Sequence, residues 1–202
     1  MKRDNADLRA EKFVLAVVVM LFLMIILSQH IYDVPTALFF TLALALLQRE
    51  KWSAYAWLFP FVCLNRETAI LLTLLFGVYF FTRMDRRLYL WHLGYQLVVY
   101  LVIRIALMSI FADVPGSPLY FRLAENLQLY ANEPVATNMF LLFVVMVLCI
   151  VAARWRQAPG LMRTAFLLFA PILTLLYLIA GVSFEVRVFV ELLPVVAIIG
   201  SS

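Results

Sequence analysis

The residues best suited to chemistry in this chain are a few carboxylates and arginines that interrupt long apolar runs. The clearest interruption is the stretch NRET at residues 65–68, which separates two strongly hydrophobic segments. A carboxylate can act as a general base or bind a metal ion, and an arginine can hold a phosphate group through its permanently charged, bidentate fork. We therefore predict Asp33 and Glu67 as catalytic candidates, and Arg66, Arg122, Glu185 and Arg187 as substrate-binding candidates.

The sequence carries none of the familiar motifs of soluble enzymes. It has no Gly-rich phosphate loop, no CxxC pair, no HExxH and no GxSxG. Cys63 and Cys149 both lie inside apolar runs without the spacing of metal ligands, so we interpret them as residues of helix packing. The residues themselves therefore predict no metal site.

The elements that must position these residues are predicted to be membrane helices. The 202 residues are 66% hydrophobic and 14% charged, with a mean hydropathy of +1.00. A soluble domain cannot bury that much apolar surface, so the composition predicts an all-α, polytopic integral membrane protein. The net charge is +4, but the basic residues lie in short loops rather than in one patch, which argues against nucleic acid as a partner.

Eight apolar segments predict about eight transmembrane helices within a single transmembrane domain, residues 1–202, with residues 1–12 as a cytoplasmic cap. The segments are 13–30, 34–48, 52–64, 69–82, 88–111, 136–153, 164–182 and 184–200. With the N-terminus in the cytoplasm, all but four of the 16 lysines and arginines fall on the cytoplasmic side, as the positive-inside rule requires. The four are Arg66, Arg122 and Arg187, which lie outside, and Arg104, which lies within a span.

Two of these segments, 34–48 and 52–64, are shorter than the roughly 17 residues that a crossing usually needs. Asp33 and residues 65–68 must then be drawn into the outer half of the membrane. Such a position is tolerable only beside polar partners or water. The extracytoplasmic side is therefore the predicted location of any chemistry.

The long outer loop, residues 112–135, is predicted to contain one interfacial amphipathic helix over residues 118–131. Ser117 suits its N-cap and Pro118 its first helical position. Its apolar stripe would lie in the membrane interface. Two interpretations stay open: a connector that rests on the bilayer, or a lid that guides a substrate towards Arg122.

Two charged residues lie deep inside predicted spans. Arg104 and Glu191 lie about seven residues from the outer ends of their segments, a depth of roughly 10 Å. An isolated charge there costs at least ~2.5 kcal/mol, so we predict a structural ion pair between them. The alternatives are a pair between Glu191 and Arg187, which are four residues apart, and a substrate-facing role for Glu191.

Two stretches carry a resemblance to a known family. YDVPT at residues 32–36, followed by NRET, resembles the middle region of bacterial GT-C-type membrane glycosyltransferases, and FEVRVFVELLP at residues 184–194 is similar to a later segment of related proteins. The resemblance implies an all-helical protein that transfers a sugar from a polyprenyl-phosphate donor at the extracytoplasmic face. It also implies that the arginines hold the donor's phosphate, that membrane lipids surround the chain, and that a divalent metal is a conceivable cofactor, since some members use one.

The first outer loop departs from the family pattern. The family's catalytic carboxylate usually lies in a long first outer loop, whereas Asp33 is the sole acid of a short one here. We therefore expect a shortened or truncated member. The alternative is a non-enzymatic membrane protein, such as a component of a lipid-linked glycan flippase or an assembly partner, which would use the same polar residues for binding alone.

Overall fold

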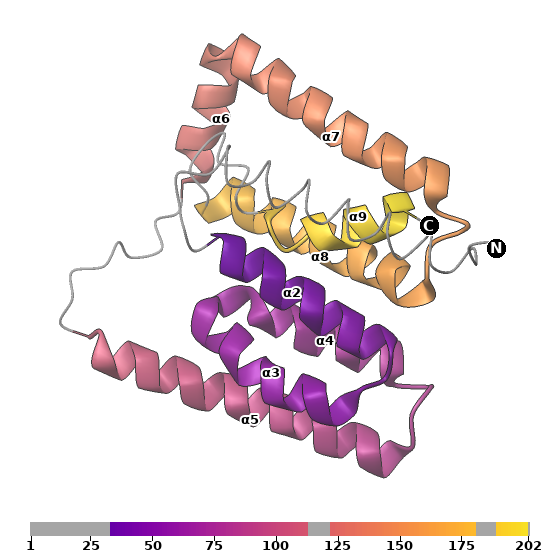
Figure 1. Ribbon diagram of the computed structural model, residues 1–202. Helices are drawn as coiled ribbons and strands as arrows, with labels where there is room; N and C mark the ends of the chain where they lie inside the picture. The colour runs from indigo at the N-terminus through magenta and orange to yellow at the C-terminus, as the bar shows by residue number, and fades with distance from the viewer. Residues whose placement is uncertain (1–32, 113–121, 181–188, 202) are drawn as a thin grey trace. The chain divides into compact units, whose positions relative to one another are not determined.

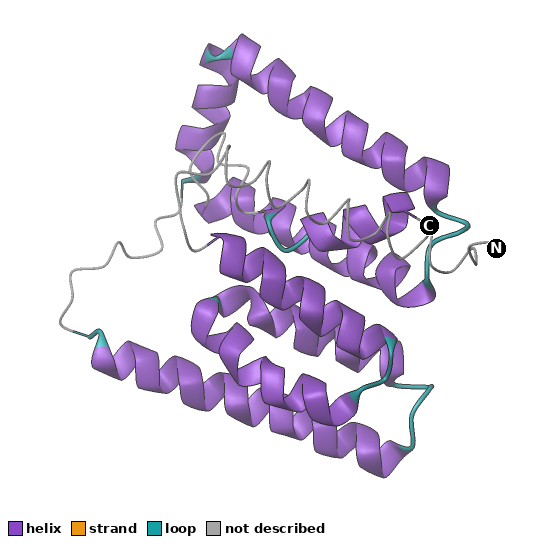
Figure 2. Cartoon of the chain, in the orientation of Figure 1, coloured by secondary structure: helices purple, strands orange, loops and turns teal. Residues whose placement is uncertain are grey.

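In the computed structural model, all regular structure in the described residues, 33–112, 122–180 and 189–201, is helical (Figures 1 and 2). The elements are α2 (Asp33–Gln48), α3 (Trp52–Asn65), the 3-10 turn η1 (Glu67–Ala69), α4 (Ile70–Phe80), α5 (Arg86–Ile110), α6 (Leu123–Asn132), α7 (Pro134–Arg154), α8 (Gly160–Ala180) and α9 (Leu193–Ser201). The predicted all-α class is confirmed. The first predicted span, 13–30, and the cytoplasmic cap, 1–12, lie outside the described residues.

The prediction of about eight transmembrane helices is wrong for the part of the chain that the structure describes. There, only α5 and the Gly160–Ile179 part of α8 are long and apolar enough to cross a membrane. Helices α2 and α3 have 16 and 14 residues, or about 24 and 21 Å at ~1.5 Å per residue. These lengths fall short of the roughly 30 Å hydrocarbon core.

The physical reason for this error is that hydropathy does not separate contact with lipid from burial inside the protein. Many large apolar side chains of the short helices pack inside the protein and have no exposed surface, as at Phe40, Leu44, Phe59 and Leu72, although others, such as Trp57, are exposed. A run of such residues has the hydropathy of a membrane span, although in the folded protein the residues form part of a core.

The described helices belong to two compact units, each of which is considered by itself. The α2–α5 unit comprises residues Ile31–Ser117, and the α6–α9 unit comprises Pro118–Ser202 together with Met1–His30. In the α2–α5 unit, α2 packs on α3, and both α3 and α4 pack on α5. Most of α5 is exposed, since only Tyr89 and Gln96 of its 25 residues are buried.

Aromatic rings join three helices at one end of the α2–α5 unit. The Trp52 ring, at the start of α3, meets the Phe76 and Phe80 rings of α4 edge-on, with centroids 6.0 and 4.9 Å away. It also lies 5.8 Å from His92 of α5, and Phe76 stacks on Tyr89 of α5 at 5.8 Å. This cluster therefore brings the turn between α2 and α3 close to the turn between α4 and α5.

The turn between α2 and α3 holds a residue in a strained backbone conformation. Glu50 has φ 54°, in the left-handed region where a Cβ atom clashes with the backbone. Glu50→Gly is expected to raise the free energy of unfolding by about 0.5–1 kcal/mol, because the relief of strain exceeds the added entropy of an unfolded glycine. Chemical denaturation in detergent micelles measures the effect. Glu50→Gln, which keeps the Cβ and removes the charge, is the control; equal stabilisation by both variants would refute the backbone explanation.

In the α6–α9 unit, α6 is fastened to the C-terminal end of α8. The backbone N–H of Arg122 donates to the Ile179 carbonyl at 2.8 Å, and Asn126 Nδ2 donates to the Leu178 carbonyl at 3.1 Å. These bonds satisfy carbonyls that a helix end leaves without partners. One face of α6 is thus polar and protein-bound, while Leu127 on another face is 57% exposed.

A third bond on the same face of α6 joins the Tyr130 and Tyr177 hydroxyls at 2.6 Å. Burial and this hydrogen bond raise the pKa of Tyr130 above its ordinary value of 10.0. The bond therefore holds through the physiological pH range. The predicted interfacial helix, 118–131, corresponds to α6 from Leu123 onward, and its predicted start at Ser117 and Pro118 lies outside the described residues.

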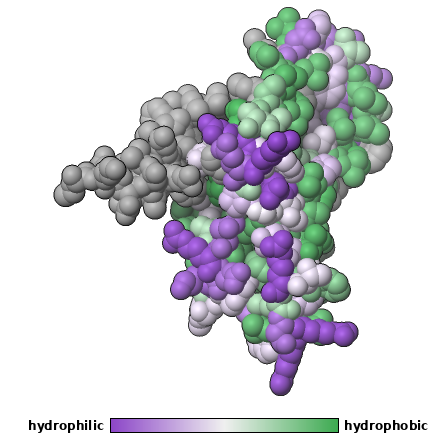
Figure 3. All heavy atoms as spheres, turned by 90° about the vertical axis from the view of Figure 1, so that its right-hand side faces the viewer, coloured by the Kyte–Doolittle hydropathy of each residue, from purple (hydrophilic) through white to green (hydrophobic). Residues whose placement is uncertain are grey.

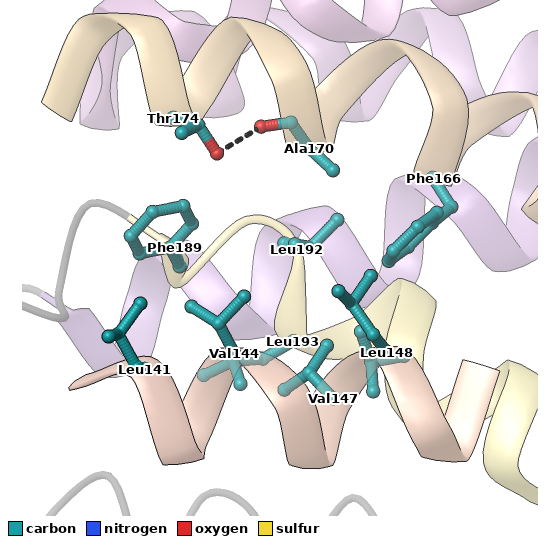
Figure 4. A pocket seen from close by; sticks show the side chains of 11 residues that line it. Leu141, Val144, Val147, Leu148, Phe166, Ala170, Thr174, Phe189, Leu192 and Leu193 are labelled. Atoms are coloured by element: carbon teal, nitrogen blue, oxygen red, sulfur yellow. Dashed lines mark hydrogen bonds between the residues drawn. The ribbon is translucent and has the colours of Figure 1, made fainter. Parts of the chain in front are cut away.

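Helices α7, α8 and α9 line a partly open apolar cavity of about 230 Å³ (Figure 4). Leu148 of α7 faces Phe166 of α8 across it, and Leu141 of α7 lies opposite Phe189 at the other end. The hydroxyl of Thr174, the single polar side chain in the lining, donates to the Ala170 carbonyl at 2.7 Å. The lining therefore offers a polar ligand almost nothing beyond the Thr174 hydroxyl oxygen, and the cavity has no place in the polar chemistry considered below.

Candidate functional site at the NRET turn

The NRET stretch forms the turn between α3 and α4, as its break in hydrophobicity predicts. Helix α3 ends at Asn65, and Arg66 adopts an extended conformation with φ −150° and ψ 145°. The turn η1 follows at once and leads into α4. Because the backbone leaves the helical path at Arg66, side chains that are neighbours in sequence are directed to different helices.

The first two residues of the motif contact the start of α2. Arg66 Nη2 donates to Asp33 Oδ1 at 2.6 Å and forms an ion pair with it. Asn65 Nδ2 donates to the hydroxyl of Thr36 at 2.7 Å. Asp33 and Thr36 lie one helical turn apart and are both fully buried, while the Arg66 side chain is 19% exposed. These two bonds fix the α3–α4 turn to the N-terminal end of α2.

The third residue of the motif, Glu67, contacts α5 on the other side. Its carboxylate lies 3.5 Å from Arg104 Nη1, and its backbone carbonyl accepts a hydrogen bond of 3.0 Å from the Tyr100 hydroxyl. Arg104 Nη2 also donates to the Cys63 carbonyl at 3.2 Å. A cation bound to the last carbonyls of a helix is favourable, because it offsets the negative end of the helix dipole.

The two candidate catalytic carboxylates have very different surroundings. The Asp33 side chain has no exposed surface, whereas the Glu67 side chain is 73% exposed. Asp33 Oδ2 and Arg104 Nε are buried atoms that find no hydrogen-bond partner among the described residues. Glu67 is therefore the carboxylate that a substrate can reach, and Asp33 is the one that holds Arg66.

The remaining predicted site residues belong to the α6–α9 unit. Arg122 precedes α6, and Glu185 and Arg187 lie outside the described residues. Glu191 is fully buried in that unit, so its predicted ion pair with Arg104 stays a prediction, as does the grouping of Arg122, Glu185 and Arg187 with the NRET turn. Within the described ranges, no group of three or more His, Cys, Asp or Glu residues is placed to hold a metal ion.

Two residues of this site and one ion pair were not predicted from the sequence. Thr36, Tyr100 and the partnership of Arg104 with Glu67 did not enter the predictions. A signal was present, since Asp33 and Thr36 are three residues apart and Tyr100 and Arg104 are four apart, and such spacings place side chains on the same face of a helix. Which faces meet depends on the packing of distant helices, which the spacing alone does not give.

Comparisons of this chain with protein-family models, curated proteins and solved structures found no match. The function of the protein is therefore inferred from the geometry of the NRET turn and from the resemblance of its motifs.

Proposed function

We propose that this protein is a GT-C-like membrane protein whose NRET turn binds the phosphate of a polyprenyl-phosphate sugar at the extracytoplasmic face. The observation that carries the proposal is that a single turn holds two partly exposed arginines beside fixed partners, Arg66 against Asp33 of α2 and Arg104 against the exposed Glu67. Their side chains are 19% and 21% exposed, so neither side chain is closed off from a ligand.

Both arginines are held in place before a ligand arrives. Arg66 is anchored by Asp33 at 2.6 Å, and Arg104 by the Cys63 carbonyl at 3.2 Å. Fixing a long side chain in advance reduces the entropy lost on binding. The planar fork of arginine also matches the geometry of phosphate oxygens. These contacts support the assignment of a phosphate-binding role to the pair.

In the transfer reaction we assign the general base to Glu67 and the positioning of Arg66 to Asp33. Glu67 would take the proton of the acceptor hydroxyl as its oxygen forms the bond to the anomeric carbon of the sugar. The bond from that carbon to the phosphate oxygen breaks, and polyprenyl phosphate leaves with the electron pair. Arg66 and Arg104 would stabilise the negative charge that develops on the leaving phosphate. Arg122, Glu185 and Arg187 are proposed as further substrate-binding residues.

The proposed arrangement in the membrane is multi-pass, with a cytoplasmic N-terminus. From Trp91 to Ile110, α5 runs about 29 Å at ~1.5 Å per residue, which matches the roughly 30 Å hydrocarbon core. Arg104 then lies about 9 Å inside the end of the helix. At that depth the attraction between a guanidinium and a phosphate is stronger than in bulk water, which supports a donor site beside the NRET turn.

The proposal is tested with Arg66→Lys and Arg104→Lys. A lysine keeps the charge but loses the bidentate fork, and a hydrogen bond to a charged group contributes about 1.5–3 kcal/mol. Each variant is expected to bind a synthetic polyprenyl monophosphate about tenfold or more weakly, with little change in melting temperature. Titration calorimetry in detergent micelles gives the affinity.

The matched control is Arg156→Lys, at an exposed arginine of the α6–α9 unit. It is expected to bind the lipid as the wild type does. Unchanged affinity in Arg66→Lys and Arg104→Lys, together with a lowered melting temperature, would overturn the proposal and leave the NRET turn as a structural tie between helices.

A further inference from the structure

The end of the α2–α5 unit opposite to the NRET turn carries a concentration of positive charge. The turn between α2 and α3 and the segment from α4 into α5 meet there, because the Trp52 ring lies 4.9 Å from Phe80 and 5.8 Å from His92. The two segments contribute Arg49, Lys51, Arg83, Arg86 and Arg87, all of which are exposed. We call these five residues the basic end. In the lower part of Figure 3, which corresponds to the α2–α5 unit, hydrophilic groups project from this side.

Few acidic groups oppose these charges. Glu50 and Asp85 are the acids of the same two turns, so five basic against two acidic residues give a net charge of +3. Asp85 is the N-cap of α5. Its carboxylate accepts hydrogen bonds from the backbone N–H groups of Arg87 and Leu88 at 3.0 and 3.4 Å. The basic end therefore presents an uncompensated cationic surface.

One of these cations is held in a fixed position. The Arg83 guanidinium lies over the Tyr79 ring, 4.1 Å from its centroid, and Arg83 Nη1 donates to the Tyr79 hydroxyl at 2.9 Å. These contacts orient the side chain through a neutral ring rather than through a carboxylate. The charge of Arg83 is thus positioned without being neutralised.

The order of residue types along α5 identifies the environment of this surface. Arg86 and Arg87 are followed one turn later by Trp91, whose ring is 66% exposed, and then by the exposed aliphatic residues Val98 and Val102. Charge, aromatic ring and aliphatic side chain follow one another in the order of a headgroup layer, an interface and a hydrocarbon core. Trp91 lies about 6 Å along the helix from Arg87, comparable to the ~5–7 Å thickness of one headgroup layer.

We propose that the basic end is a binding surface for the headgroups of anionic phospholipids in the adjacent leaflet. Several arginines and a lysine next to a membrane helix attract anionic lipid more strongly than neutral lipid. The exposed Trp91 and the exposed aliphatic residues that follow it, Val98 and Val102, match the interface and the hydrocarbon layer of a bilayer, whereas a nucleic acid offers no hydrocarbon layer for the aliphatic residues. The inference is independent of the NRET turn and of the direction in which the chain crosses the membrane.

The test uses the purified full chain in nanodiscs of phosphatidylcholine, with or without 30% phosphatidylglycerol. The wild type is expected to melt several degrees higher with phosphatidylglycerol. Arg86→Gln/Arg87→Gln is expected to lose most of that rise while melting like the wild type in pure phosphatidylcholine. Asp85 is kept, so the cap of α5 is unaffected by the substitutions.

The matched control is Arg154→Gln/Arg156→Gln, which removes two exposed arginines from the α6–α9 unit. It is expected to keep the full response to phosphatidylglycerol. Equal stabilisation of the wild type by both lipid compositions would overturn the inference. So would an equal loss of the response in the two double variants, or full displacement of phosphatidylglycerol by a short DNA duplex at equal charge.

Discussion

Arg66→Met is expected to lower the free energy of unfolding by about 3–5 kcal/mol, because it removes the ion-pair partner of the buried Asp33 carboxylate. The Asp33 side chain has no exposed surface, and Arg66 Nη2 lies 2.6 Å from its Oδ1. A charge that remains in a buried site after its partner is removed loses the attraction that offset its desolvation. Chemical denaturation of the protein in detergent micelles measures the loss.

The opposite substitution, Asp33→Asn, is expected to cost clearly less. Asparagine matches aspartate in shape and keeps an oxygen that can accept a bond from Arg66, and the arginine is 19% exposed and can draw on water. The double variant Asp33→Asn/Arg66→Met is therefore expected to be more stable than Arg66→Met alone. Strictly additive losses, or a loss in Arg66→Met no larger than in Arg156→Met, would show that the pair does not hold the turn.

The sequence predicted the helix ends of the α2–α5 unit well, because polar residues interrupt its apolar runs. The segments 34–48 and 52–64 agree with α2 and α3 to within one residue at each end. The NRET stretch was predicted as a turn, and it is one. Hydrophobic runs bounded by charged residues specify where a helix begins and ends, since a charge is costly in an apolar interior.

The sequence did not predict which residue each polar side chain contacts. Arg66 bonds to Asp33 and Glu67 to Arg104, pairings that span more than 30 positions of the chain. The number of membrane spans was overestimated for a related reason, since whether Phe40 or Leu72 meets lipid or protein depends on which helices pack together. Both questions concern tertiary packing, which a pattern of types and spacings does not determine.

The two ends of the α2–α5 unit are joined by a core whose packing should control the stability of both. Phe76 lies at the centre of the aromatic cluster near the basic end, with no exposed surface. Its ring contacts Trp52 of α3, Phe80 of α4, and Tyr89 and His92 of α5. One side chain thus connects three helices.

Phe76→Ala is therefore expected to lower the free energy of unfolding by about 3–5 kcal/mol, the range for a buried phenylalanine whose removal leaves a cavity. Phe81→Ala is the matched control, because Phe81 lies near Phe76 in sequence but is 69% exposed; its loss should stay below about 1 kcal/mol. Denaturation of both variants in the same detergent gives the comparison. If the two losses were equal, the aromatic cluster would not be the contact that unites α3, α4 and α5. The two turns of the basic end would then be held together by the other ring contacts of Trp52, with Phe80 and His92.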